Sequence, residues 1–215
     1  MSQVVIIDYE LGNLFSVRQA LENIGLKTKI SNNPADLKTA DAAVLPGVGA
    51  FGDAIKNLQR TGMADEIRAH IATGKPFMGV CLGLQLLFSN SDEFGSSEGL
   101  NILPGTVKKF ESVENQGKMI RVPQIAWNEI YEGEVNWENT PLQSLKRNEH
   151  MYFVHSFYVQ PDDESVVLSR TRYGNKEYTS SVFKNNIFAC QFHPEKSAQN
   201  GLAIYKSWAK QNNLI

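Results

Sequence analysis

Residues Gly79-Val80-Cys81-Leu82-Gly83 decide how the rest of the chain is interpreted, because they join two apolar segments of different kinds. Residues 75–78, which include Pro76, predict a short strand, and residues 82–88 predict a buried helix. A strand that enters a helix through Gly-x-Cys-x-Gly is typical of a nucleophile elbow. Its sharp turn strains the central residue, so the positions two before and two after Cys81 must be nearly free of side chains.

This turn predicts an exposed Cys81 at a helix N-terminus, where the helix dipole and free N–H groups favour a thiolate. The same residues also suit a buried structural cysteine between two packing glycines, so the elbow alone leaves both interpretations open. The other cysteine, Cys190, alternates with apolar neighbours and is interpreted as core packing. Two cysteines make no disulfide framework.

Composition excludes several classes of protein. The 215 residues carry 21 Lys and Arg against 23 Asp and Glu, scattered without a basic stripe, which argues against a nucleic-acid binder. No apolar run approaches the ~18 residues of a membrane helix, and the N-terminal residues 1–3 do not resemble a signal peptide. We therefore expect one domain over residues 1–215, in the cytoplasm, where thiols stay reduced.

The first half of the chain alternates strands with helices, which predicts a parallel sheet covered on both faces. Sites in such sheets collect at the carboxyl ends of the strands, where Cys81 and the loop 46–49 both fall. Asn13 is a suitable N-cap for the first helix, and Gly25 a suitable residue to end it. We expect strands over residues 4–7, 27–30, 42–45 and 75–78, and helices over 14–24, 34–38 and 50–73, the last interrupted near Gly62.

The second half has a different pattern. Residues 89–99 are polar and indicate a flexible segment, and tight turns at 174–175 and 185–186 indicate antiparallel hairpins. The predicted fold is therefore α/β, flavodoxin-like, with a mixed, mostly parallel central sheet flanked by helices and hairpins in the C-terminal half. Strands are expected over 106–110, 151–159, 166–172, 178–183 and 187–192, an extended stretch over 121–128, and a last helix over 198–208.

A second candidate catalytic feature is His193-Pro194-Glu195, which directly follows a predicted strand. Pro194 keeps His193 out of the helical region, and residues two apart in extended backbone point the same way. Glu195 could then orient one imidazole nitrogen and leave the other for Cys81, as in a Cys-His-Glu triad. A turn that only caps the last helix is the alternative. A metal site is not expected, because His150 and His155 lack ligand spacing with either cysteine.

Several stretches of the chain, taken in order, match the motifs of one family: Asp8-Tyr9 with Gly12-Asn13, residues 45–51, residues 79–88, Trp127-Asn128, residues 153–158 and residues 191–197. With them the chain resembles the class I (triad) glutamine amidotransferases, and among them the branch that forms the glutaminase subunit of imidazole glycerol phosphate synthase. Two departures stand out: Glu10 replaces a frequent glycine, and Gln124 and Ala126 replace a His and a Gly.

The resemblance implies the chemistry of the site. Cys81 would attack the side-chain amide of L-glutamine, with His193 as base and Glu195 as its orienting partner. The oxyanion would be held by the N–H of Leu82 and by the segment Gly47-Val48, where glycines at 47 and 49 make a peptide flip easy. The resemblance implies no cofactor and no metal.

The resemblance also implies substrate-binding and partner-facing residues. Gln85 lies one helical turn beyond Cys81 and would contact the amino-acid end of glutamine, although a core-edge amide is the alternative. The remaining substrate-binding candidates are Gly49, Glu93, Ser156 and Phe157. Asn13, Trp127 and Lys196 would face the partner; the alternatives are a simple cap, a core aromatic and a solvated charge.

The partner implied by the resemblance is a (β/α)8-barrel cyclase subunit. It would form a heterodimer with this chain and use the ammonia to make imidazole glycerol phosphate and aminoimidazole carboxamide ribotide, in histidine biosynthesis. One alternative is a paralogous subunit that supplies ammonia to another synthetase, such as one modifying a surface sugar. A second alternative is a cysteine peptidase or chaperone of the same architecture. A third is a degenerate regulatory subunit, but an intact triad argues against that one.

Overall fold

The β-branched run near the N-terminus forms strand β1 (Gln3–Ile7), which is buried on both faces. Val4 and Ile6 pack into one hydrophobic cluster, and Val5 and Ile7 pack into another on the opposite face. This alternation follows from the two-residue period of a strand. A continuous apolar run therefore marks a strand that separates two cores, as predicted.

The computed structural model describes residues 2–215. Its helices are α1 (Leu14–Asn23), α2 (Pro34–Thr39), α3 (Phe51–Arg60), α4 (Met63–Ala72), α5 (Leu82–Leu86) and α6 (Ala198–Gln211), with the 3-10 turns η1 (Glu164–Val166) and η2 (Pro194–Lys196). The further strands are β2 (Lys27–Ser31), β3 (Ala42–Gly47), β4 (Phe77–Cys81), β5 (Phe88–Ser91), β6 (Ser97–Glu98), β7 (Leu103–Lys109), β8 (Glu114–Asn115), β9 (Lys118–Met119), β10 (Gln124–Glu132), β11 (Glu149–His155), β12 (Phe157–Pro161), β13 (Val167–Tyr173), β14 (Lys176–Lys184) and β15 (Ile187–Cys190).

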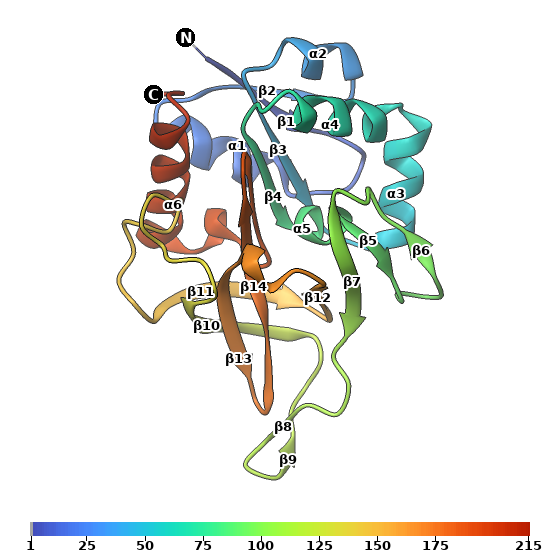
Figure 1. Ribbon diagram of the computed structural model, residues 1–215, viewed down its shortest axis with the longest axis vertical. Helices are drawn as coiled ribbons and strands as arrows, with labels where there is room; N and C mark the ends of the chain where they lie inside the picture. The colour runs from blue at the N-terminus through green and yellow to red at the C-terminus, as the bar shows by residue number, and fades with distance from the viewer. Residues whose placement is uncertain (1) are drawn as a thin grey trace.

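One 13-stranded sheet runs through the described residues in the order β2-β1-β3-β4-β15-β14-β12-β7-β5-β6, with β13, β10 and β11 branching from β14. Its first five strands are mutually parallel. Helices α1 and α6 cover one face of this part, and α2, α3 and α4 cover the other (Figure 1). The predicted α/β class with a mostly parallel flanked core is confirmed.

The C-terminal half adds the antiparallel pairs. Its strands β10, β11 and β13 extend below the parallel core, beside β12 and β14 (Figure 1). The hairpins predicted at residues 174–175 and 185–186 join β13 to β14 and β14 to β15, so both are confirmed.

Several predicted elements differ in the structure. The helix that follows the elbow ends at Leu86, because the chain turns there into β5, which pairs with β7. Residues 89–99 were expected to be flexible, but they contain β5 and β6, which pair as a hairpin. The strand expected over 151–159 breaks at Ser156 into β11 and β12, which join different neighbours. Helices α3 and α4 separate at Gly62, with φ +73°, as predicted.

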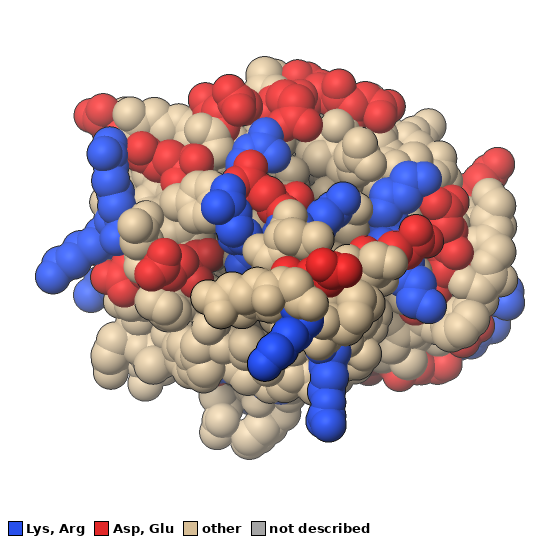
Figure 2. Space-filling view, turned by 90° about the horizontal axis from the view of Figure 1, so that it is seen from below, with Lys and Arg blue, Asp and Glu red and all other residues tan. Residues whose placement is uncertain are grey.

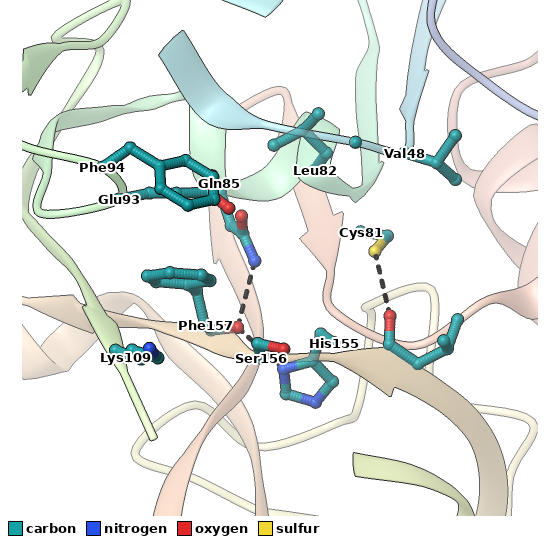
Figure 3. Close-up of a pocket in the computed structure, with 12 residues that line it drawn as sticks. Val48, Cys81, Leu82, Gln85, Glu93, Phe94, Lys109, His155, Ser156 and Phe157 are labelled. Atoms are coloured by element: carbon teal, nitrogen blue, oxygen red, sulfur yellow. Dashed lines mark hydrogen bonds between the residues drawn. The ribbon is translucent and has the colours of Figure 1, made fainter. Parts of the chain in front are cut away.

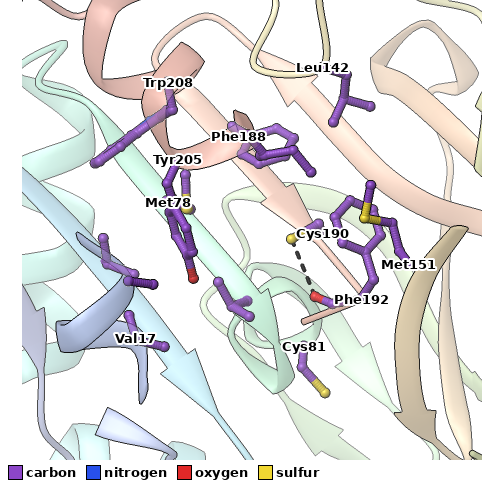
Figure 4. Packing of buried hydrophobic residues seen from close by; sticks show 14 of the residues in the cluster. Val17, Met78, Cys81, Leu142, Met151, Phe188, Cys190, Phe192, Tyr205 and Trp208 are labelled. Carbon is purple, nitrogen blue, oxygen red and sulfur yellow. Dashed lines mark hydrogen bonds between the residues drawn. The ribbon is translucent and has the colours of Figure 1, made fainter. Parts of the chain in front are cut away.

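The two buried hydrophobic clusters pack against the elbow that carries Cys81. Cys190 is fully buried within one cluster, where its Sγ lies 3.4 Å from the carbonyl oxygen of Phe192. Figure 4 shows Cys81 at the edge of that cluster, with its sulfur directed away from the packed side chains. The prediction that Cys190 serves packing is confirmed.

Charges of both signs are intermixed on the face shown in Figure 2, where Lys and Arg side chains lie among Asp and Glu rather than in one basic patch. Ion pairs among the exposed side chains include Lys108 with Asp92 at 2.7 Å and Arg172 with Glu177 at 3.2 Å. Over residues 2–215, none of the helices combines the length and the apolar character that crossing a membrane requires.

Candidate active site

Strand β4 ends in a strained turn at Cys81, whose backbone angles are φ +56° and ψ −109°. A positive φ costs a side-chain-bearing residue free energy, and such strain clusters at functional sites. A Cβ on Gly83 would press into the carbonyl oxygen of Leu45, and one on Gly79 would lie 2.9 Å from the carbonyl oxygen of Gly83. Both glycines are therefore required by close backbone approach, as the elbow predicts.

Cys81 itself is less accessible than the sequence predicts. The residue is only 6% exposed, because Val154 and Gln191 lie over its sulfur. The Sγ atom is 4.0 Å from the carbonyl oxygen of Val154 and 3.5 Å from Nε2 of Gln191. The expectation of an exposed cysteine is wrong, but Cys81 still lines a cavity of about 430 Å³ that could admit a small substrate.

His193 and Glu195 form a buried pair beyond the end of β15. Nδ1 of His193 is 2.7 Å from Oε1 of Glu195, and their side chains are 2% and 1% exposed. Since a carboxylate only accepts, Nδ1–H donates and Nε2 is left for another group. Nε2 has no hydrogen-bond partner among residues 2–215. The prediction of extended backbone through both residues is partly wrong, because His193 is extended but Glu195 lies in the 3-10 turn η2.

The electrostatics of His193 favour the charged imidazolium. Burial lowers its pKa, but the Cys81 thiolate and the Glu195 carboxylate outweigh burial and raise the pKa of His193 to about 10. Near neutral pH His193 is therefore the charged imidazolium, a group that can donate a proton to a reacting atom.

The sheet brings Cys81 and His193 together although they are distant in sequence. Strand β15 lies parallel to β4, with Cys190 opposite Val80 in register. Because both strands end at the same edge, the residues that follow them emerge side by side. The predicted meeting of the two motifs at one sheet edge is confirmed by this register.

Strand β3 delivers the candidate oxyanion segment to the same edge. It continues past Leu45, where the strand was expected to end, and Gly47 pairs with Cys81. A Cβ on Gly47 would collide with the Tyr9 hydroxyl and lie 2.8 Å from the Cβ of Leu82. Gly47 is therefore required by packing, whereas Gly49, with φ +100°, supplies the conformational freedom.

The cavity collects all five of the predicted substrate-binding residues. Gly49, Gln85, Glu93, Ser156 and Phe157 line it together with Val48, Cys81 and Leu82 (Figure 3). Sequence reasoning missed four further lining residues, which are Phe94, Lys109, Val154 and His155. Only the stretch 153–158, quoted for its family likeness, contained a signal for two of them.

Two of these side chains are held in place by hydrogen bonds. The Nε2 group of Gln85 donates to the carbonyl oxygen of Phe157 at 3.1 Å, which Figure 3 shows, and to Oε1 of Gln191 at 3.0 Å. The Glu93 carboxylate accepts the N–H of Phe51 at 2.6 Å, at the start of α3. With Lys109, the cavity thus presents one acidic and one basic group, which suits a zwitterionic amino acid.

The predicted partner-facing residues lie outside the cavity. Trp127 is 49% exposed on β10, so it is not a core aromatic. Its ring centroid is 6.1 Å from that of Tyr152, and the Lys196 Nζ lies 5.6 Å from the same Tyr152 ring. Tyr152 in turn lies 6.4 Å from the His193 ring. Trp127, Tyr152 and Lys196 therefore form one partly exposed patch adjoining the His193 ring.

Asn13 occupies the N-cap position of α1, but its side chain makes no capping bond within residues 2–215. The cap interpretation thus fails on the hydrogen bond, although the boundary is correct. Over the same residues no three His, Cys, Asp or Glu side chains are grouped so that they could hold a metal ion.

Two of the three departures from the family pattern have structural correlates. Glu10 adopts φ +72°, a conformation that suits the glycine expected from the resemblance, and its carboxylate pairs with Arg60 at 2.8 Å. Gln124 is fully buried, where it accepts from the Tyr178 hydroxyl at 2.9 Å and donates to Asn128 at 3.0 Å. Ala126 is half-buried on the same strand and nothing in the structure explains its presence.

Comparison with known proteins agrees with this geometry. The family model of class-I glutamine amidotransferases matches residues 5–209, so the chain belongs to this class. A solved structure of PurLQS from Thermotoga maritima superimposes with a TM-score of 0.74 at 20% identity, over 97% of this chain and 98% of that one, which shows the shared fold.

Curated relatives narrow the class to one family. Imidazole glycerol phosphate synthase subunit HisH from Syntrophotalea carbinolica is 45% identical over 206 residues, covering 95% of this chain and 98% of the relative. The subunit of the same name from Aquifex aeolicus is 45% identical over 210 residues, covering 97% of each. The chain belongs to the HisH family of imidazole glycerol phosphate synthase subunits.

Proposed function

We propose that this chain is the glutaminase subunit of an imidazole glycerol phosphate synthase, which hydrolyses L-glutamine and supplies ammonia for histidine biosynthesis. The proposal treats residues 1–215 as a single domain, in keeping with the one sheet that both halves share. The observation that carries it is the buried His193–Glu195 pair, 2.7 Å apart, at the sheet edge where the elbow places Cys81. The family relationship favours this function over a sugar-modifying synthetase or a peptidase.

In the first step, the Cys81 thiolate attacks the side-chain amide carbon of glutamine and forms a tetrahedral intermediate. The S–C bond forms as the carbonyl π pair moves onto oxygen. His193 then gives its Nε2 proton to the amide nitrogen, the C–N bond breaks, and ammonia leaves a glutamyl thioester. Glu195 keeps Nδ1 protonated throughout and stabilises the imidazolium.

In the second step, water replaces the thiolate. His193, now neutral, accepts a proton from water as the water oxygen attacks the thioester carbon. The S–C bond breaks, the new side-chain carboxyl group gives its remaining proton to solvent as glutamate departs, and the thiolate–imidazolium pair is restored. The net reaction converts glutamine and water into glutamate, ammonia and a proton, which together are glutamate and ammonium.

Both steps pass through an oxyanion that needs donors aimed at it. We assign these to the N–H of Leu82, which opens α5, and to the peptide between Gly47 and Val48. The segment lies beside Cys81 in the ladder, and Val48 lines the cavity. Gly49 follows with φ +100°, which supports a hinge for this peptide.

The cavity would bind the amino-acid end of glutamine away from the sulfur. Glu93 is suited to the α-ammonium group and Lys109 to the α-carboxylate, because their charges are opposite to those of the substrate. Gln85, Ser156 and Phe157 would position the groups between them.

The family name of the relatives implies that this chain works with a second subunit. We propose that this partner is a (β/α)8-barrel cyclase that forms a heterodimer with the chain and receives the ammonia. The partly exposed patch of Trp127, Tyr152 and Lys196, together with Asn13, would contact it. That patch adjoins His193, so partner docking and catalysis share one face of the molecule.

The decisive experiment compares two nitrogen sources in the reconstituted synthase. With Cys81→Ala, glutamine-dependent synthesis should disappear, while synthesis from added ammonia should continue, because the cyclase chemistry does not need the thiol. Cys190→Ala is the matched control and should retain both activities, since Cys190 lies in the core. Loss of both activities with Cys81→Ala, or retention of both, would show that the chemistry is misplaced.

A further inference from the structure

Gln191 is a fully buried amide that the mechanism above does not use. It follows strand β15 and precedes His193 by two residues. Its main-chain N–H donates to the carbonyl oxygen of Ser180 at 2.8 Å, which anchors its backbone to β14. The side chain therefore starts from a fixed position next to Cys81, with its nitrogen 3.5 Å from the sulfur.

The orientation of the Gln191 side-chain amide follows from a series of hydrogen bonds that starts at the main-chain carbonyl of Phe157. The carbonyl oxygen of Phe157 can only accept, so the Gln85 group facing it at 3.1 Å must be the amide nitrogen. His155 donates to the same oxygen through Nδ1 at 2.7 Å. One carbonyl oxygen can accept two such bonds, one to each lone pair.

The nitrogen of Gln85 carries a second hydrogen, and this hydrogen faces Oε1 of Gln191 at 3.0 Å. With its oxygen turned toward Gln85, Gln191 must present its nitrogen to Cys81. A reversed Gln191 amide would place two nitrogens against each other and an oxygen against the thiolate. The order of donors from Phe157 through Gln85 and Gln191 to Cys81 is thus unique.

We propose that Gln191 is a further catalytic residue, whose amide N–H donates to the Cys81 thiolate and holds it toward the cavity. The inference rests on the proposed function, because it takes Cys81 as the nucleophile. His193 supplies the opposite charge, whereas Gln191 supplies a neutral donor that stays a donor at every working pH. Gln85 has a second role as the group that keeps this donor correctly turned.

The test measures the reactivity of Cys81 directly. The full chain is treated with iodoacetamide at pH 7, and alkylation of Cys81 and of Cys190 is followed separately by peptide mass spectrometry. Gln191→Met removes a hydrogen bond to a charged sulfur, and such bonds stabilise more strongly than neutral ones. The change should therefore slow Cys81 alkylation by roughly 10- to 100-fold. Gln191→Glu, which has the same shape but a carboxylate facing the sulfur, should slow it at least as much.

A matched control is Gln160→Met, which makes the same change at an exposed position on β12 and should alkylate at the wild-type rate. Circular dichroism tests the fold of every variant. If Gln191→Met does not fold, Gln191→Glu preserves the shape and tests the same donor. Gln85→Met should also slow alkylation of Cys81, because Gln85 orients the Gln191 amide. Since iodoacetamide does not occupy the whole glutamine cavity, this slowing would not reflect lost substrate binding.

Two results would overturn the inference: folded Gln191 variants that alkylate within twofold of wild type, or slowing that Gln160→Met shares. Failure of the proposed function would appear differently. In that case the wild-type chain with its cyclase would show no glutaminase activity that depends on Cys81. Slow alkylation in the Gln191 variants, with a wild-type rate in the control, supports the inference.

Discussion

Nδ1 of His193 and Oε1 of Glu195 are 2.7 Å apart, and neither side chain is more than 2% exposed. This contact exists because the backbone changes at Pro194 from extended at His193 to a 3-10 turn at Glu195. The turn brings the two side chains together, whereas a continued strand would have kept them spaced along its axis. Burial lowers the pKa of His193, but the neighbouring Cys81 and Glu195 outweigh it and raise that pKa, so local backbone geometry sets the acid–base chemistry of the histidine.

Glu195→Gln should lower kcat for glutamine by about 10³- to 10⁴-fold, with a smaller change in KM. The amide can present N–H to Nδ1, which favours the tautomer whose Nε2 already carries a proton and cannot accept one. Steady-state kinetics with the cyclase bound would measure the effect. Glu138→Gln, an exposed change of the same type, is the control. A Glu195→Gln enzyme within tenfold of wild type would contradict the orienting role.

His155→Asn should reduce the sensitivity of the fold to acid. Burial lowers the pKa of His155 to about 4. The hydrogen bond to the Phe157 carbonyl acts in the opposite direction but is weaker, and the nearby His193 charge lowers the pKa further. The unfolded chain takes up a proton below about pH 6.5, whereas the folded chain resists protonation until about pH 4. Stability is therefore fully present above pH 6.5 and falls by roughly 3 kcal/mol as the pH approaches 4.

Urea unfolding between pH 4 and 7 measures this slope. Asn can keep a donor toward the Phe157 carbonyl in place of Nδ1–H, so His155→Asn should fold and show a flatter acid limb. His150→Asn, an exposed position on the same strand, should keep the wild-type slope. Equal slopes for His155→Asn and wild type would refute the assignment.

Gly49→Ala tests the hinge of the oxyanion segment. With φ +100° and its nearest atom at 3.7 Å, Gly49 has room for a methyl group but not a relaxed backbone for one. Gly74 has φ +80° and open space around it, far from the cavity, so Gly74→Ala is the matched control. Each change should cost about 1 to 2 kcal/mol of unfolding free energy. Only Gly49→Ala should also lower kcat; equal kinetic effects would remove the case for a hinge.

Trp127→Ala should weaken binding to the cyclase subunit, raising Kd by roughly tenfold to hundredfold, since exposed aromatic anchors dominate interfaces. Titration calorimetry with the purified barrel measures this affinity. Met119→Ala removes another exposed apolar side chain, 65% exposed on β9, and should leave Kd unchanged. Unchanged affinity for Trp127→Ala would place the interface elsewhere.

Much of the fold could be predicted because its signals are local. The apolar run of β1, the glycines at 79 and 83, and the turn at Gly62 each follow from strand periodicity or short-range sterics. The segments predicted incorrectly depend on distant partners. Residues 89–99 become a hairpin only because β7 is available to pair with β5, and Ser156 interrupts a strand because β11 and β12 join different neighbours.

The candidate site also combines features that local sequence sets with features that distant residues set. By itself, the sequence determined the elbow around Cys81 and the His193-Pro194-Glu195 turn, because spacing and backbone chemistry act over a few residues. The set of cavity residues came instead from the resemblance of the sequence to a family. Only the tertiary structure decided that Cys81 is buried, that Lys109 and His155 reach the cavity, and that the Gln191 amide faces the sulfur. Strand register and burial set these relations, since both arise from residues far apart along the chain.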